Sequence, residues 1–124
     1  MADNTRTILV VDDNEENRDI LQRRLGRLGY AVTSVGEGRA ALSALQNGHY
    51  DLVILDIHMP IMDGLEVLKR LKADEALSAI PVLMLTALED KDIVLECMQG
   101  GACGYLTKPY NMKDVEQRIL YCLR

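Results

Sequence analysis

Three aspartates follow two strongly apolar segments of the chain. Asp12 and Asp13 come directly after residues 7–11, and Asp56 comes directly after residues 52–55. Short, continuous apolar runs are typical of strands that are buried on both faces of a parallel sheet, so each run should end in a carboxylate at the carboxyl edge of that sheet. Because ligands of open α/β sheets bind at this edge, the three acids predict one polar site.

A hydroxyl and an ammonium group are expected at the same edge. Thr86 ends a further apolar segment, and Lys108 follows a short one. Neighbouring carboxylates stay ionised together near neutral pH only if a hard cation lies among them, and Mg²⁺ suits such a site because it keeps water and phosphate among its ligands. With Lys108 and the metal neutralising a phosphoryl group and Thr86 donating a hydrogen bond, Asp56 is the best candidate for the nucleophile of an in-line displacement.

The elements that must position these residues alternate strictly along the chain, without repeats or low-complexity stretches. Strands are predicted at residues 7–11, 31–35, 52–55, 81–85 and 105–106. Helices are predicted after a cap at Asn14 or Asp13, at residues 38–46, after a cap at Asp63, at residues 91–99 and at residues 111–123. Right-handed crossovers between such strands predict an α/β fold, a doubly wound three-layer sandwich.

Apolar stripes indicate which face of three of these helices is buried. The expected inward residues are Ile20, Leu21, Leu25 and Leu28 in the first helix, Leu65, Leu68 and Leu71 in the third, and Val115, Ile119 and Leu123 in the fifth.

Composition fits a single globular domain. The chain has 124 residues, of which 48% are hydrophobic and 27% charged, so a core of ordinary size needs neither a disulfide nor a structural metal. The three cysteines, Cys97, Cys103 and Cys122, are odd in number and contain no C-x-x-C, and we expect them to be small buried hydrophobes in a reducing cytoplasm.

Charge and hydropathy exclude several classes of protein. The formal net charge of −5 and the lack of a Lys/Arg cluster argue against direct nucleic-acid binding. No apolar run is long enough to span a membrane, and residues 1–6 lack the pattern of a signal peptide. We therefore expect a cytoplasmic protein without membrane association.

Several short motifs occur together over nearly the whole chain. They are Val10-Val11-Asp12-Asp13-Asn14, Asp56-x-x-Met59-Pro60-x-Met62-Asp63-Gly64, Thr86-Ala87, Gly101-Ala102 and Tyr105-Leu106-x-Lys108-Pro109.

Jointly, these motifs resemble the CheY-like receiver domain of two-component response regulators. The resemblance implies a flavodoxin-like (βα)5 fold with strand order 2-1-3-4-5 and one receiver domain over residues 1–124, with no output domain in this chain. It implies that Asp56 is the phosphoacceptor and that Asp13, Asp56 and the backbone carbonyl of His58 bind Mg²⁺, for which Mn²⁺ can substitute, while Asp12 helps through water. Thr86 and Lys108 would grip the acyl phosphate.

The resemblance also implies a switch and its partners. Tyr105 would turn inward when Thr86 is drawn toward the phosphate, and the surface of the fourth helix, fifth strand and fifth helix would change. The phosphoryl donor would be a sensor histidine kinase or a histidine phosphotransfer protein. The recipient of the signal would be a downstream effector or a fused output domain, and a homodimer could form. His58 and Leu88 would flank the phosphate, and a cis bond is expected between Lys108 and Pro109.

Each of these roles has an alternative. Asp12 and Asp13 could merely cap a helix, Thr86 could be an ordinary strand residue, and Lys108 could be a solvated loop lysine. A haloacid-dehalogenase-type phosphatase would need a second aspartate where His58 stands. A flavodoxin-like mononucleotide carrier would need a glycine- and hydroxyl-rich loop after the first strand, where this chain is acidic. An interaction domain that acts without phosphorylation remains the main alternative. As a receiver, the chain would catalyse its own phosphorylation and dephosphorylation but would be primarily a signalling switch.

Overall fold

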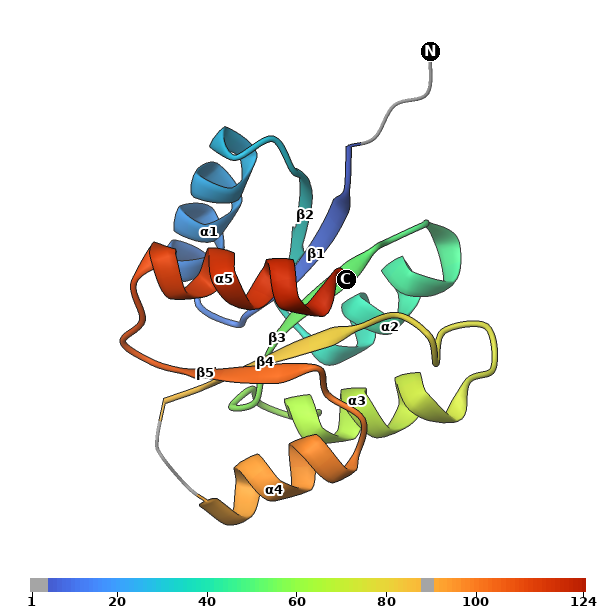
Figure 1. Cartoon of the computed structure of the whole chain (residues 1–124). Helices are drawn as coiled ribbons and strands as arrows, with labels where there is room; N and C mark the ends of the chain where they lie inside the picture. Colours follow the sequence, from blue (N-terminus) through green and yellow to red (C-terminus); the bar gives the residue numbers. More distant parts are fainter. Residues whose placement is uncertain (1–4, 88–90) are drawn as a thin grey trace.

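A computed structural model describes residues 5–87 and 91–124 of the chain (Figure 1). Leu88, which was expected to flank the phosphate, and residues 1–4, which were predicted to contain no signal peptide, therefore lie outside the described residues. Within the described part, strands and helices alternate as predicted. Their bounds are β1 Thr7–Val11, α1 Glu15–Arg27, β2 Ala31–Val35, α2 Gly38–Asn47, β3 Leu52–Asp56, α3 Gly64–Ala73, β4 Val82–Thr86, α4 Lys91–Gln99, β5 Gly104–Thr107 and α5 Met112–Cys122.

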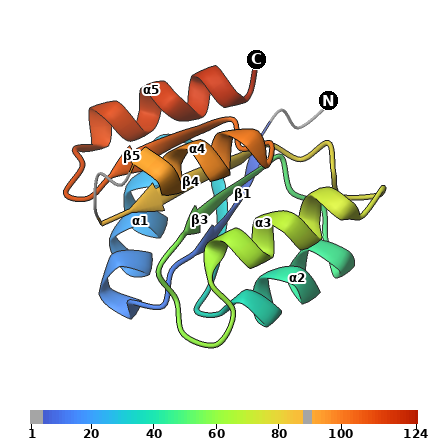
Figure 2. The same cartoon turned by 90° about the horizontal axis from the view of Figure 1, so that it is seen from below.

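The strands form one parallel sheet in the order β2-β1-β3-β4-β5, which confirms the predicted doubly wound fold. Helices α1 and α5 cover one face of the sheet, and α2, α3 and α4 cover the other (Figures 1 and 2). The central strands β1, β3 and β4 are buried almost throughout because both of their faces are covered. Their apolar runs therefore hold the carboxyl edge of the sheet in a fixed place.

Side-chain caps fix where three of the helices begin. Asn14, Asp63 and Asn111 each accept a hydrogen bond from the backbone N–H three residues later, at 3.0, 2.9 and 2.8 Å. Such a cap satisfies one of the N–H groups that the first turn of a helix leaves without a partner. For α1 the structure selects Asn14 over Asp13, which leaves the Asp13 carboxylate available to the sheet edge.

Two sets of buried side chains form the core, one on each face of the sheet. In α1 only Leu21 and Leu25 are buried, whereas Ile20 is 44% and Leu28 45% exposed, so the predicted stripe was too wide. The buried face of α3 includes Val67, which was not predicted, and Leu65 is only partly buried.

In α5, Val115 and Ile119 are buried as predicted, and Leu123 is partly buried just beyond the helix.

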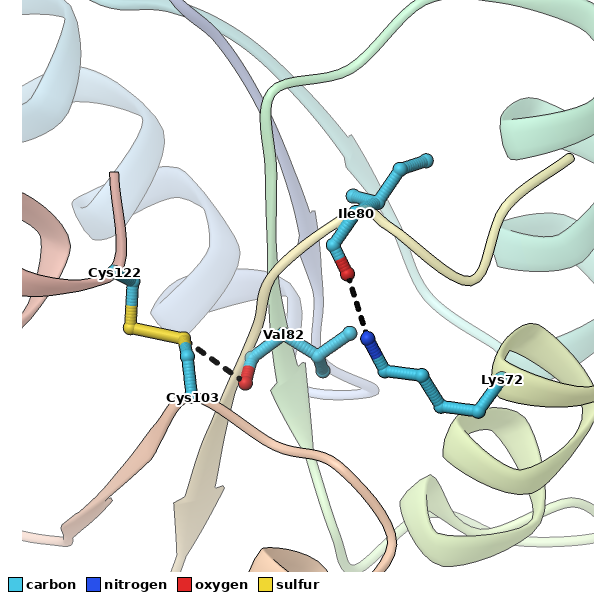
Figure 3. Close-up of a disulfide and its surroundings, with 5 residues drawn as sticks. All are labelled: Lys72, Ile80, Val82, Cys103 and Cys122. Atoms are coloured by element: carbon cyan, nitrogen blue, oxygen red, sulfur yellow. Dashed lines mark hydrogen bonds between the residues drawn. A yellow bond between two sulfur atoms is a disulfide. The ribbon is translucent and has the colours of Figure 1, made fainter. Parts of the chain in front are cut away.

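The prediction for the cysteines was wrong for two of them. Cys103 and Cys122 form a disulfide, drawn in Figure 3, and both are partly buried. Residue spacing did not indicate this pair, because Cys103 is brought to the end of α5 only by the pairing of β5 with β4 and the return of the helix across the sheet. Cys97 is a buried free cysteine, as expected.

No helix among the described residues is long and apolar enough to cross a membrane.

Candidate functional site

The three aspartates converge at the carboxyl edge of the sheet. β1 and β3 are neighbours, with Val11 opposite Leu55, so Asp12 and Asp56 extend side by side from the ends of these strands. Each of Asp12, Asp13 and Asp56 offers one carboxylate oxygen, and these three oxygens lie within 4.8 Å of one another. Asp12 and Asp56 are buried, while Asp13 is exposed. The cluster is therefore open to solvent on the side of Asp13.

Lys108 places a positive charge against the two buried acids. Its Nζ lies 3.1 Å from Asp12 Oδ2 and 3.4 Å from Asp56 Oδ2. The backbone N–H of Lys108 donates to the carbonyl of Thr86 at 2.6 Å, which ties the segment after β5 to the end of β4. The peptide bond between Lys108 and Pro109 is cis, as the resemblance implied.

Thr86 completes the set of predicted residues at this edge. It is the last residue of β4 and is buried. Because Asp56 pairs with Leu85, Thr86 lies one residue farther along the neighbouring strand than the acid. Its hydroxyl side chain thus stands at the same end of the sheet as the carboxylates.

Backbone N–H groups orient the two buried carboxylates. Asp12 Oδ1 accepts from the N–H of Asn14 at 2.9 Å, and Asp56 Oδ1 accepts from the N–H of His58 at 3.3 Å. Arg18 of α1 donates from a guanidinium nitrogen to the backbone carbonyl of Asp12 at 2.7 Å. One oxygen of each buried acid is held by the main chain, and the other faces Lys108.

Burial raises the pKa of the Asp56 carboxyl above its ordinary value. The Lys108 ammonium opposes this rise, and the negative charge of Asp12 adds to it. The same two acids act on Tyr110, whose pKa is raised to about 12 by burial first and then by Asp12 and Asp56. Negative charge is thus concentrated where solvent screens it poorly.

The loop after β3 brings α3 against the site. Gly64 begins α3, and its N–H donates to the carbonyl of Ile57 at 2.8 Å. A Cβ at this position would lie 2.3 Å from the backbone oxygen of Asp56, so no side chain fits without a shift of the main chain. Between these points Ile61 has a φ of 70° and Met62 donates to the carbonyl of Pro60 at 2.8 Å, a tight turn that reverses the chain.

The structure thus brings together Asp12, Asp13, Asp56, Thr86 and Lys108. Of the remaining predicted residues, His58 is exposed at the rim of the site, and Tyr105 is 37% exposed on β5.

Arg18, Gly64 and Tyr110 were not among the predicted site residues. Gly64 did carry a signal, because it stands directly after the cap Asp63 in a quoted motif.

Comparisons with known proteins agree with this geometry. Residues 8–120 match the family model described as "Response regulator receiver domain". The chain is 37% identical to the chemotaxis protein CheY of Pseudomonas aeruginosa, over 90% of this chain and 91% of that protein. It is 41% identical to the probable transcriptional regulator ycf27 of Cyanophora paradoxa over 100% of this chain, and it spans about half, 51%, of the length of that relative.

Solved structures give the same result. The structure of the Vibrio cholerae chemotaxis protein CheY4 superposes with a TM-score of 0.91 at 31% identity, covering 96% of this chain and 99% of that one. The receiver domain of the Francisella response regulator 1452 superposes with a TM-score of 0.87 at 29% identity, covering 94% of this chain and 97% of that one.

Proposed function

The chain belongs to the response regulator receiver family of two-component signalling, and from this we propose that it is a switch operated by phosphorylation of Asp56. The observation that carries the proposal is the contact of one ammonium with two buried carboxylates. Lys108 Nζ lies 3.1 Å from Asp12 and 3.4 Å from Asp56, beside a third acid. Uncompensated negative charge at a buried sheet edge is costly for folding, and such groupings are typical of sites that bind or transfer charged ligands.

The donor set fits Mg²⁺. Three carboxylate oxygens within 4.8 Å of one another are hard ligands of the kind that this ion prefers. Asp13, Asp56 and the backbone carbonyl of His58 would hold the metal, and Asp12 would contribute through water; Mn²⁺ could take the same place. When bound, the metal supplies positive charge that neutralises the oxygens of an incoming phosphoryl group. Because Asp13 is exposed, both the metal ion and the phosphoryl group can reach the site.

Asp56 is the nucleophile in this proposal. One of its carboxylate oxygens forms a bond to phosphorus while the bond between phosphorus and the imidazole nitrogen of a donor phosphohistidine breaks, and the imidazole keeps the electron pair of that bond. Asp56 is suited to the role because the N–H of His58 holds Oδ1 while Oδ2 faces the Lys108 ammonium at 3.4 Å. The product is an acyl phosphate at the end of β3.

Lys108 and Thr86 then respond to the new charge. The phosphoryl group adds nearly two negative charges, so the Lys108 ammonium gains a better partner and the Thr86 hydroxyl can donate to a phosphoryl oxygen. A movement of Thr86 at the end of β4 leaves room beside β5, where Tyr105 is half-exposed. The surface of α4, β5 and α5 is therefore the part whose shape we propose to depend on phosphorylation.

Partners follow from this chemistry. The family implies a kinase that supplies the phosphoryl group and an effector that reads the switch. We propose a histidine kinase or histidine phosphotransfer protein as donor, acting in the cytoplasm. A separate effector or a fused output domain would receive the signal, and receiver pairing could form a homodimer. We also propose that residues 1–124 form one receiver domain, which is supported by the match of residues 8–120 to the family model.

Phosphorylation of the purified chain by a small acyl phosphate in the presence of Mg²⁺ tests the proposal. Lys108→Ala should still take up some phosphoryl group, because the nucleophile is intact, but should no longer respond to it. Hydrogen exchange over β5 and α5 before and after phosphorylation measures that response. If phosphorylation changes hydrogen exchange over β5 and α5 in Lys108→Ala as much as in the wild type, the proposed role of Lys108 is contradicted. No uptake and no Mg²⁺ binding by the wild type would favour an interaction domain that acts without phosphorylation.

A further inference from the structure

The disulfide between Cys103 and Cys122 joins two elements of the proposed response surface. Cys103 directly precedes β5, and Cys122 is the last residue of α5, with their Cα atoms 5.6 Å apart. β5 is an edge strand of the sheet, and its far end leads to Lys108. The bond therefore ties the end of a helix to the beginning of a strand that runs into the acidic site.

The disulfide lies at the end of α5 where few other side chains are buried. The buried residues of α5 are Val115 and Ile119, and Cys122 follows Ile119 by three positions, on the same face of the helix. Leu120 and Tyr121 of the last turn are more than half exposed. Apolar packing thus holds the first two turns of α5, and the last turn depends on the partly buried Cys122 and its neighbour Leu123.

The surroundings of Cys103 suit a free thiol as well as a disulfide. Its Sγ lies 3.3 Å from the carbonyl oxygen of Val82, as Figure 3 shows. A disulfide sulfur carries no hydrogen, so this contact becomes a hydrogen bond only when Cys103 is reduced and its S–H can donate. Reduction therefore leaves the Cys103 thiol with a partner already in place.

The chain just before Val82 is held in place by contacts with α3 that do not involve the cysteines. Lys72 of α3 donates to the carbonyl of Ser78 at 2.9 Å and to that of Ile80 at 3.0 Å, just before β4 begins at Val82. Figure 3 shows the bond to Ile80. Breaking the disulfide should therefore release the end of α5 and leave the start of β4 where it is.

Accessibility separates this pair from the third cysteine. Cys103 and Cys122 are partly buried, whereas Cys97 is fully buried and burial raises the pKa of its thiol. Because the thiolate is the reactive form and must be reached by its reagent, Cys97 should be inert in the folded protein. Cysteine chemistry should be confined to the pair at β5 and α5.

We propose that Cys103 and Cys122 are a reversible thiol–disulfide modification site that locks and releases the last turn of α5. Two full layers of core exist without the bond, so the fold does not depend on it. Disulfides of reducing compartments are usually transient and redox-sensing, which fits a bond at a response surface rather than within the core. Oxidation should also restrain signalling, because β5 carries Tyr105. This consequence rests on the proposed function.

The oxidant is a small disulfide of the glutathione type. One cysteine thiolate attacks a sulfur of the small disulfide, forming a mixed disulfide and releasing one small thiolate. The second cysteine thiolate then attacks the protein sulfur of that mixed disulfide and releases the second small thiolate, which takes up the remaining proton. Two protein thiols are oxidised to one disulfide, and one small disulfide is reduced to two thiols.

The test is hydrogen exchange of the amides of residues 120–123 in buffers of reduced and oxidised glutathione. In the wild type we expect exchange to be roughly tenfold or more faster in reduced glutathione, because the crosslink restrains opening of the last turn. Cys103→Ala and Cys122→Ala should exchange at one rate in both buffers. Cys97→Ala should keep the wild-type difference, since that residue takes no part in the bond.

Native alkylation followed by intact mass measures the bond itself. Two more groups should be alkylated in reduced than in oxidised glutathione, and Cys97 should react only after unfolding. A bond that stays closed, or stays open, at every glutathione ratio would overturn reversibility, and equal exchange in both buffers would overturn the locking of α5. Hydrogen exchange and alkylation of Asp56→Asn should show the same dependence on glutathione as the wild type. The redox proposal can therefore be tested even if the phosphorylation proposal fails.

Discussion

Asp56 combines burial with a like charge at its side, and this has a cost for the folded state. The pKa of Asp56 is raised mainly by burial, so the folded protein binds its proton more tightly than the unfolded chain does. The free energy of unfolding therefore falls as pH rises from the unfolded pKa through the folded one, and the full cost is present above the folded pKa. Functional sites commonly reduce stability in this way.

Asp56→Asn should consequently stabilise the metal-free protein at neutral pH, by on the order of 1 kcal/mol, because it removes one of two buried charges while Lys108 keeps Asp12 as partner. The gain should disappear at a pH below the unfolded pKa. Urea unfolding across pH measures it. The control Asp19→Asn removes an exposed carboxylate from α1 and should change stability by less than about 0.5 kcal/mol. A less stable Asp56→Asn protein at neutral pH would contradict this electrostatic account.

Tyr110 also responds to the charges of Asp12 and Asp56. Its pKa is raised to about 12, and Asp12 and Asp56 contribute to the rise after burial. The difference in tyrosinate absorbance between the wild type and Tyr110→Phe should therefore titrate with a pKa of about 12. The substitution Asp56→Asn should lower this pKa. Because the folded state holds this proton more tightly than the unfolded chain, the stability contributed by Tyr110 should be lost as pH rises from 10 to about 12. An isolated Tyr110 titration near 10 would show that the acids do not act on it.

For single residues, the sequence predicted the position of those site residues that stand at the ends of strands. Asp12, Asp56 and Thr86 were predicted together because each stands at the end of an apolar run, and parallel strands share one carboxyl edge. Arg18 and Tyr110 could not be predicted in this way. Their side chains come from a helix and a loop, and their approach to the acids depends on packing that no local pattern encodes.

At the scale of elements, the contact between α3 and the end of β3 requires glycine. A Cβ at residue 64 would meet the backbone oxygen of Asp56 at 2.3 Å and the Cα of Ile57 at 2.8 Å. Both of these atoms belong to the main chain, so a larger residue must displace α3 or the backbone at Asp56 and Ile57. The site and the packing of α3 are therefore coupled through one position.

Gly64→Ala should destabilise the protein by roughly 2 kcal/mol and slow the phosphorylation of Asp56, because overpacking here moves the main chain of the site. Gly26→Ala is the matched control: it lies in α1, and a Cβ there would meet nothing within 4 Å. That variant should gain about 0.5–1 kcal/mol from helix propensity. Denaturant unfolding and the rate of acyl phosphate uptake measure both variants. Equal stability of the two proteins would refute the predicted close contact.

Element ends were easier to predict than element faces. The caps Asn14, Asp63 and Asn111 are local signals, and each begins a helix where expected. The stripe of α1 was overestimated at Ile20 and Leu28, because how much of a helix is buried depends on how far the neighbouring elements extend over it. The disulfide was missed for a related reason, since its two residues meet only after β5 has joined the sheet.

At the scale of the whole molecule, metal binding should be linked to folding. The acids that would hold Mg²⁺ come from the ends of β1 and β3, so the site exists only in the folded sheet. A ligand that binds the folded state alone raises the free energy of unfolding, by about 2.7 kcal/mol at a concentration one hundred times its Kd. The alternation of strands and helices predicted the sheet that creates this site, whereas the strand order was implied only by the resemblance.

Mg²⁺ should therefore stabilise the wild type in a concentration-dependent manner, and this effect should be much weaker in Asp13→Asn. Because Asp13 is exposed, that variant should unfold much like the wild type when a chelator is present. Thermal unfolding at increasing Mg²⁺ measures the difference. An identical dependence of the two proteins on Mg²⁺ would argue that the ion binds elsewhere.

The proposed function depends above all on Asp56 being the phosphoacceptor. This role is best measured by intact mass after incubation with a small acyl phosphate, either with Mg²⁺ or with a chelator. The proteins compared are the wild type, Asp56→Asn and Asp19→Asn. We predict a single phosphoryl addition to the wild type and Asp19→Asn with Mg²⁺, little addition in chelator, and none to Asp56→Asn. Persistent addition to Asp56→Asn, or no addition to a wild type that binds Mg²⁺, would show that Asp56 is not the phosphoacceptor.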